Sequence, residues 1–158
     1  MARIRKSPEV LEIMKYHLFI DGASRGNPGK SGSGFLILDD KGQDVDKGGS
    51  YLGVQTNNFA EYSALVEGLK ACLPHGIKHL EIRSDSELLV RQVNGEYRVK
   101  STNIAPLFRI AKSLLSQFVS VNIKHIPRSQ NDKADRLANL SIDTFLEMAE
   151  KGGQPLED

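Results

Sequence analysis

Four acidic residues stand where a carboxylate is well placed for chemistry. Asp21 and Asp85 each close an apolar, strand-like segment, whereas Glu61 and Asp135 fall in the first turns of segments with helical periodicity. Four carboxylates brought close together repel one another unless cations intervene. Hard oxygen ligands favour Mg²⁺ or Mn²⁺, and no His/Cys set suited to zinc accompanies them. Two such ions would clamp the attacking and leaving oxygens of a phosphoryl displacement.

Each carboxylate also has an ordinary explanation. Asp21 is followed by glycine, which is a common start of a turn. Glu61 lies three residues after Asn58, the spacing of a helix-capping arrangement. Asp85 precedes a helical segment and would serve as its N-cap, and Asp135 has basic neighbours typical of a solvated face. The decision rests on whether the fold brings the four together.

The elements that must position these residues follow from hydrophobic periodicity. Strands separated by short links form an antiparallel meander, and strands separated by helices are parallel, with right-handed crossovers. We therefore predict an α/β fold with a mixed five-stranded sheet, three strands antiparallel and two parallel, flanked by helices. Asp21 and Asp85 would then lie at the carboxyl edge, where open α/β sheets place their sites. The predicted strands cover 16–21, 34–38, a weaker one within 45–53, 79–84 and 119–126, and the predicted helices cover 56–73, 86–93, 104–117 and 131–149.

Length and composition indicate one domain. The chain has 158 residues, 39% of them hydrophobic, with a net charge of +1 that gives no global sign of nucleic-acid binding. Its single cysteine, Cys72, excludes an intrachain disulfide and suits the reducing cytoplasm. No apolar run is long enough to span a membrane. We expect a flexible extension over 1–14, a domain over 15–149 and a flexible tail over 150–158.

Four motifs stand in a fixed order within about residues 15 to 145. They are Asp21-Gly-Ala-Ser-Arg-Gly-Asn-Pro-Gly29, Thr56-Asn-Asn-Phe-Ala-Glu61, Ser84-Asp-Ser86 and His125-Ile-Pro-Arg-Ser-Gln-Asn-Asp-Lys-Ala-Asp135-Arg-Leu-Ala-Asn139. As a set they closely resemble type 1 ribonuclease H, the ribonuclease HI family. The resemblance implies the ribonuclease H-like fold.

The same resemblance implies an activity and a cofactor. It makes Asp21, Glu61, Asp85 and Asp135 the metal-binding catalytic carboxylates. The implied reaction is endonucleolytic hydrolysis of the RNA strand of an RNA/DNA hybrid, which leaves a 5′-phosphate and a 3′-hydroxyl. It would use two Mg²⁺ ions, with Mn²⁺ as a substitute. A monomer without an obligate protein partner is expected.

Substrate-reading residues are implied as well. Asn27, Asn57 and Asn58 match amide groups that contact the RNA strand, where the 2′-hydroxyl distinguishes RNA from DNA. Thr56 matches a position that helps to hold a DNA phosphate, with a partner at residue 101 or 103. Without the resemblance, asparagines in a loop are ordinary turn formers.

The chain departs from parts of the family at two places. Some members carry a long basic protrusion after the third carboxylate. Here the corresponding segment, 94–102, is short and has only two basic residues, Arg98 and Lys100. Some members also have a histidine on a flexible loop before the last helix, which assists proton transfer or product release. His125 has a compatible spacing, ten residues before Asp135, but it fits a histidine at the end of a strand equally well.

Two other functions compete with this interpretation. One is a catalytically weak or inactive module of the same fold that binds hybrids, although no carboxylate has been lost. The other is a nucleotide-binding protein, suggested by Gly29-Lys30-Ser31, but Ser24 stands where a P-loop requires glycine. Other metal-dependent nucleases share the fold, and Asn57 and Asn58 favour a hybrid substrate over theirs.

Overall fold

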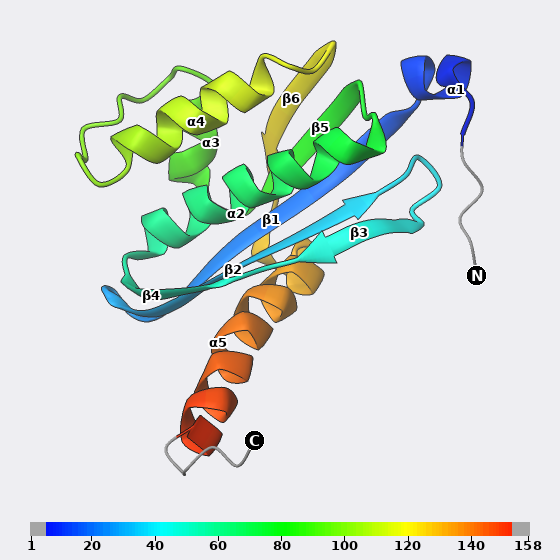
Figure 1. The fold of residues 1–158 in the computed structure, drawn as a ribbon. Coiled ribbons are helices and arrows are strands. Elements are labelled where there is room, and N and C mark those ends of the chain that lie inside the picture. The colour runs from blue at the N-terminus through cyan, green and yellow to red at the C-terminus, as the bar shows by residue number, and fades with distance from the viewer. Residues whose placement is uncertain (1–5, 153–158) are drawn as a thin grey trace.

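The computed structural model describes residues 6–152, which form one mixed sheet with helices on both faces (Figure 1). The order of the strands is β3-β2-β1-β5-β6, with β4 also paired to β2. The β1–β2 and β2–β3 pairs are antiparallel, whereas β5 is parallel to β1 and β6 is parallel to β5. The predicted fold class is therefore confirmed. The strands are β1 (Lys15–Gly26), β2 (Gly29–Leu38), β3 (Asp44–Gly48), β4 (Tyr51–Gln55), β5 (His79–Ser84) and β6 (Ser120–His125).

The third strand differs from the prediction because it is divided into β3 and β4, which gives the sheet six strands. Between the two pieces, Ser50 donates its N–H to the Ser33 hydroxyl at 3.0 Å and accepts the Ser33 N–H at 2.9 Å. Both pieces still pair with β2. The interruption lies beside a half of β2 that is rich in glycine and serine, where strand propensity is low.

Helices pack on both faces of the sheet. On one face lie α2 (Asn57–Cys72), the 3₁₀ turn η1 (Leu73–His75), α3 (Glu87–Val93) and α4 (Ala105–Leu115) (Figure 1). On the other, α5 (Asp132–Gly152) crosses β2 and β1 after the 3₁₀ turn η2 (Arg128–Gln130). A Cβ atom on Gly34 of β2 would lie 2.5 Å from the nitrogen of Ala138, so only glycine lets α5 approach this closely.

The core lies mainly between β1, β5 and the layer containing α2. Leu18 and Ile20 of β1 and Leu65 and Leu69 of α2 are fully buried. Burial raises the pKa of the Cys72 thiol to about 12, because the charged form is poorly solvated there. Cys72 is therefore a small hydrophobic residue in the core, as its place on the buried face of a helix predicts.

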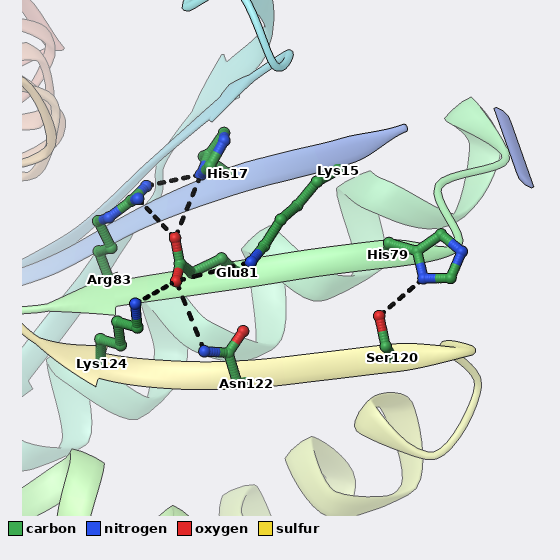
Figure 2. A network of polar contacts seen from close by, with 8 residues as sticks. All are labelled: Lys15, His17, His79, Glu81, Arg83, Ser120, Asn122 and Lys124. Atoms are coloured by element: carbon green, nitrogen blue, oxygen red, sulfur yellow. Dashed lines mark hydrogen bonds and ion pairs between the residues drawn. The ribbon is translucent and has the colours of Figure 1, made fainter. Parts of the chain in front are cut away.

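No described helix covers the second face of the sheet over β5 and β6, where charged side chains gather instead (Figure 2). Glu81 is at the centre, with a side chain only 4% exposed. A hydrogen bond from Lys124, at 2.8 Å, and the charges of Arg83 and Lys15 lower the pKa of Glu81 to about 2. The groups around Glu81 are Lys15, His17, Arg83, Asn122 and Lys124.

Helical structure extends beyond both ends of the predicted domain. Helix α1 (Pro8–Ile13) lies within the predicted extension, and Met14 after it is buried in the core. The nearby Lys6 ammonium lies 3.7 Å from Asp39 and 5.4 Å from the centre of the Tyr16 ring. Helix α5 continues beyond residue 149 to Gly152. The remainder of the predicted extension and tail, 1–5 and 153–158, lies outside the described residues.

None of the described helices combines the length and the apolar character that a membrane span needs.

Candidate functional site

Three of the four predicted carboxylates meet at one point. Asp21, Glu61 and Asp85 each place an oxygen within 4.8 Å of the others. The parallel register pairs Ile20 with Ser84, so the residues that follow them, Asp21 and Asp85, are neighbours at the sheet. Asp21 does not end its strand as predicted, because β1 continues through the hairpin to Gly26.

A close backbone contact brings Glu61 to Asp21. A Cβ atom on Gly22 would lie 2.3 Å from both the carbonyl carbon of Ala60 and the nitrogen of Glu61. Such distances are too short for any side chain, so α2 rests directly on the backbone of β1 at this residue. The glycine after Asp21 therefore serves helix packing, and the predicted turn alternative is wrong because the strand does not turn there.

The capping explanations also fail. The N-cap of α2 is Thr56, whose hydroxyl accepts the N–H of Phe59 at 3.2 Å. The N-cap of α3 is Ser86, which accepts from the N–H of Leu89. Neither Asn58 with Glu61 nor Asp85 performs these tasks. Asp85 instead accepts a hydrogen bond at 3.0 Å from the side chain of Asn131, so its carboxylate is directed toward the site.

Asp135 joins the group from α5. It lies beside Asp21, where its charge and a side-chain hydrogen bond contribute to the raised pKa of Asp21. Asn139 donates to the Asp135 carboxylate at 3.3 Å and to its carbonyl oxygen at 3.0 Å. Arg136 pairs with Asp132 instead. The structure thus brings all four predicted carboxylates to one edge of the sheet, three of them in the tight group.

The electrostatics of this cluster favour a bound cation. Burial, and then the charge of Asp85, raise the pKa of Asp21 to about 8. Burial and the charge of Asp21 raise the pKa of Glu61 well above its ordinary value. The Oε2 atom of Glu61 is buried without a hydrogen-bond partner among the described residues. An orphaned carboxylate oxygen among carboxylate donors fits Mg²⁺ or Mn²⁺, which prefer oxygen ligands.

His125 lies at the margin of this site. It is the last residue of β6, opposite Ser84, and its side chain is exposed. Its Nε2 lies 3.2 Å from the carbonyl oxygen of Asp85. A carbonyl oxygen only accepts, so Nε2 carries the proton and Nδ1 is the acceptor of the neutral ring. The histidine is thus at a strand end and also against the backbone of Asp85, so the two predicted interpretations are compatible.

The predicted substrate-reading residues gather where the β1–β2 hairpin meets the start of α2. The side-chain oxygen of Asn27 accepts the backbone N–H of Asn57 at 3.0 Å. The side-chain oxygen of Asn58 is buried and has no hydrogen-bond partner in the described part of the chain. Thr56 is occupied as the N-cap of α2. Asn27 and Asn57 therefore form one polar surface across two elements.

Sequence reasoning missed two residues that contact the carboxylates, Asn131 and Asn139. Both fall within the matched motif, but an asparagine before a helix is an ordinary cap signal. Asn139 lies within a helix, where nothing in the local sequence marks an asparagine as a contact of a carboxylate. Only the three-dimensional arrangement separates them from structural asparagines.

Comparisons with known proteins identify similar sequences and structures. A family model described as "Reverse transcriptase-like" matches residues 19–141. Ribonuclease HI of Halobacterium salinarum is 38% identical, and the alignment covers 82% of this chain and 65% of the relative. The solved structure of that archaeal protein superposes with a TM-score of 0.79, and the match covers 98% of its chain.

Two further structures are similar. The N-terminal RNase H domain of a bifunctional Mycobacterium tuberculosis protein is 35% identical with a TM-score of 0.82, covering 86% of this chain and 99% of that one. The chain spans only 39% of the full mycobacterial protein. LC11-RNase H1, solved in complex with an RNA/DNA hybrid, is 37% identical with a TM-score of 0.78, covering 83% and 99%.

Proposed function

Because the chain belongs to the ribonuclease H family, within the domains described as reverse transcriptase-like, we propose that it hydrolyses the RNA strand of RNA/DNA hybrids. The observation that carries the proposal is the meeting of Asp21, Glu61 and Asp85 within 4.8 Å, with Asp135 beside Asp21. A hybrid-bound relative, LC11-RNase H1, supports the substrate.

The four carboxylates would hold two Mg²⁺ ions, with Mn²⁺ as a substitute. Bound there, such ions supply a deprotonated water and neutralise charge on the attacking and leaving oxygens. The chain contributes the rest of the site. Gly22 and the parallel register of β1 and β5 hold the carboxylates together, and burial strengthens their interaction with cations. Cleavage would leave a 5′-phosphate and a 3′-hydroxyl.

Hybrid recognition is assigned to Asn27, Asn57 and Asn58 on the RNA strand and to Thr56 near a DNA phosphate. The polar surface formed by Asn27 and Asn57 supports this, because amide groups can both donate to and accept from a 2′-hydroxyl. The side-chain oxygen of Asn58 lacks a hydrogen-bond partner among the described residues, but it is buried, so the side chain would have to move for this atom to reach the RNA strand.

His125 is proposed as an assisting residue. Because Nε2 contacts the carbonyl oxygen of Asp85, Nδ1 is the ring nitrogen left for the substrate or a water at this edge of the sheet. That position suits proton transfer or the release of product. We further propose a monomer that acts in the cytoplasm, a compartment in which the buried thiol of Cys72 stays reduced.

A cleavage assay on matched RNA/DNA, RNA/RNA and DNA/DNA duplexes tests the function. RNA within the hybrid is expected to be cut in Mg²⁺ and left intact in EDTA, and sequencing of the products identifies the ends. Glu61→Gln is the inactive control, since it keeps the size of the side chain. Equal cutting of DNA/DNA, or full activity in EDTA, would refute the proposal. Hybrid binding without cleavage would indicate the inactive module instead.

A further inference from the structure

Asn131 is a fully buried polar residue next to the carboxylates, with only 1% of its surface exposed. It lies between η2 and α5, where the chain turns into the last helix. Burying an amide is costly unless hydrogen bonds compensate for lost water. The contacts that it makes therefore indicate why an asparagine stands there.

The side-chain nitrogen of Asn131 makes two hydrogen bonds. It donates at 2.8 Å to the carbonyl oxygen of Ile20 and at 3.0 Å to Oδ2 of Asp85. Both partners accept only, so the amide must present its nitrogen to them, and its orientation is fixed. One side chain thus joins the residue before Asp21 to Asp85.

The backbone of the same residue reaches the third element. The carbonyl oxygen of Asn131 accepts the N–H of Asp135 at 3.0 Å, and its own N–H donates to Arg128 at 3.0 Å. Asn131 therefore also fixes the first turn of α5, and with it the position of Asp135. Asn131 connects the segments that carry Asp21, Asp85 and Asp135.

We infer that Asn131 is a positioning residue, which holds the carboxylate of Asp85 in the orientation that binds the metal ion. Asp85 follows the end of β5 and faces the carboxyl groups of Asp21 and Glu61, whose charged forms repel it. A donor to Oδ2 opposes that repulsion and leaves the other carboxylate oxygen to the ion. This inference rests on the proposed metal-dependent function.

Replacing Asn131 with alanine tests the inference, with Gln92→Ala as a matched control. Gln92 is also a buried amide, but it bonds to Tyr62 at 2.9 Å and to the carbonyl of Arg98 at 3.3 Å. Mg²⁺ binding is measured without substrate, by calorimetry and by the shift of Tm. The loss of an outer contact to a metal ligand typically weakens metal affinity ~10–100-fold. We expect that loss, and a lower kcat with unchanged KM, for Asn131→Ala alone.

The outcomes separate the possible explanations. If both variants lower Tm in EDTA but bind Mg²⁺ as the wild type does, Asn131 is merely structural and the inference is wrong. If the wild type itself binds no Mg²⁺, the proposed function fails first. Should Asn131→Ala not fold, NMR of the wild type replaces it. The side-chain amide protons of Asn131 are then expected to exchange slowly and to shift on addition of Mg²⁺, and an amide that does neither overturns the inference.

Discussion

Asp21→Asn is expected to stabilise the metal-free protein while it abolishes activity. The side chain keeps its size, but it no longer has to take up a proton, or carry a charge beside Asp85, when the metal-free protein folds. In the wild type the pKa of Asp21 is about 8, compared with 3.8 for an ordinary aspartate. Between these two pH values the folded protein retains a proton that the unfolded chain has released. The stability of the metal-free wild type therefore falls as the pH rises from about 4 to about 8.

The size of the effect follows from the same two values. Each pKa unit corresponds to about 1.4 kcal/mol, which sets an upper limit of roughly 4 kcal/mol at pH 7. The asparagine loses the hydrogen bonds of the carboxylate to Glu61 and Asp135, so we expect a gain of ~1–4 kcal/mol. For a domain of this size, that raises Tm by roughly 2–4 °C per kcal/mol.

Urea unfolding in EDTA between pH 4 and pH 8 measures this gain. The advantage of the variant is expected to be near zero at pH 4 and to grow steadily with pH. Mg²⁺ is expected to stabilise the wild type more than the variant, because a ligand of the native state raises stability. Asp143→Asn is the control, since that carboxylate is exposed and pairs with Arg25. Equal stability of Asp21→Asn and the wild type at pH 7 would refute the reasoning.

Three other substitutions test further features. Gly22→Ala is expected to cost roughly 1–3 kcal/mol of stability and most of the activity, because the new methyl group pushes Ala60 and Glu61 away from Asp21; full activity would contradict the close contact. Glu81→Gln is expected to lower the free energy of unfolding by ~1–2 kcal/mol at pH 7. The loss is this small because the lysine partners of Glu81 are exposed and solvent screens their charges. Since the pKa of Glu81 is about 2, the difference in urea unfolding shrinks as the pH falls from about 4.5 toward 2, and no difference at pH 7 would count against the network. His125→Ala is expected to slow turnover, by on the order of 10²–10⁴ for a proton carrier and by less for a release aid, with hybrid binding intact; unchanged steady-state and single-turnover rates would assign it to structure.

The directions of the strands and the placement of the four carboxylates on strands and helices could be predicted from the sequence. Both depend on short stretches of sequence, namely the hydrophobic periodicity of each segment and the four motifs. The caps were less predictable. Thr56 and Asn58, or Asp85 and Ser86, are all good N-caps, and local sequence does not decide between neighbours. Tertiary packing decides, because Asp85 is drawn into the site by Asn131.

The full lengths of β1 and β2 could not be predicted from the sequence either. Their hairpin halves are rich in glycine and serine, which have little intrinsic preference for strands. Pairing with β4 and the close approach of α5 hold them in place instead. The role of Asn131 was out of reach for a related reason, since its bond to Ile20 spans 111 positions of the chain.

That long span has a consequence for the newly made protein. Asp21, Glu61 and Asp85 are synthesised before Asn131 and Asp135, which follow at the start of α5. Domains fold as units once the necessary segments are available. A growing chain that ends before α5 lacks both the donor to Asp85 and the fourth carboxylate. The cluster of carboxylates can therefore be completed only after α5 has been synthesised and has docked on Gly34 of β2.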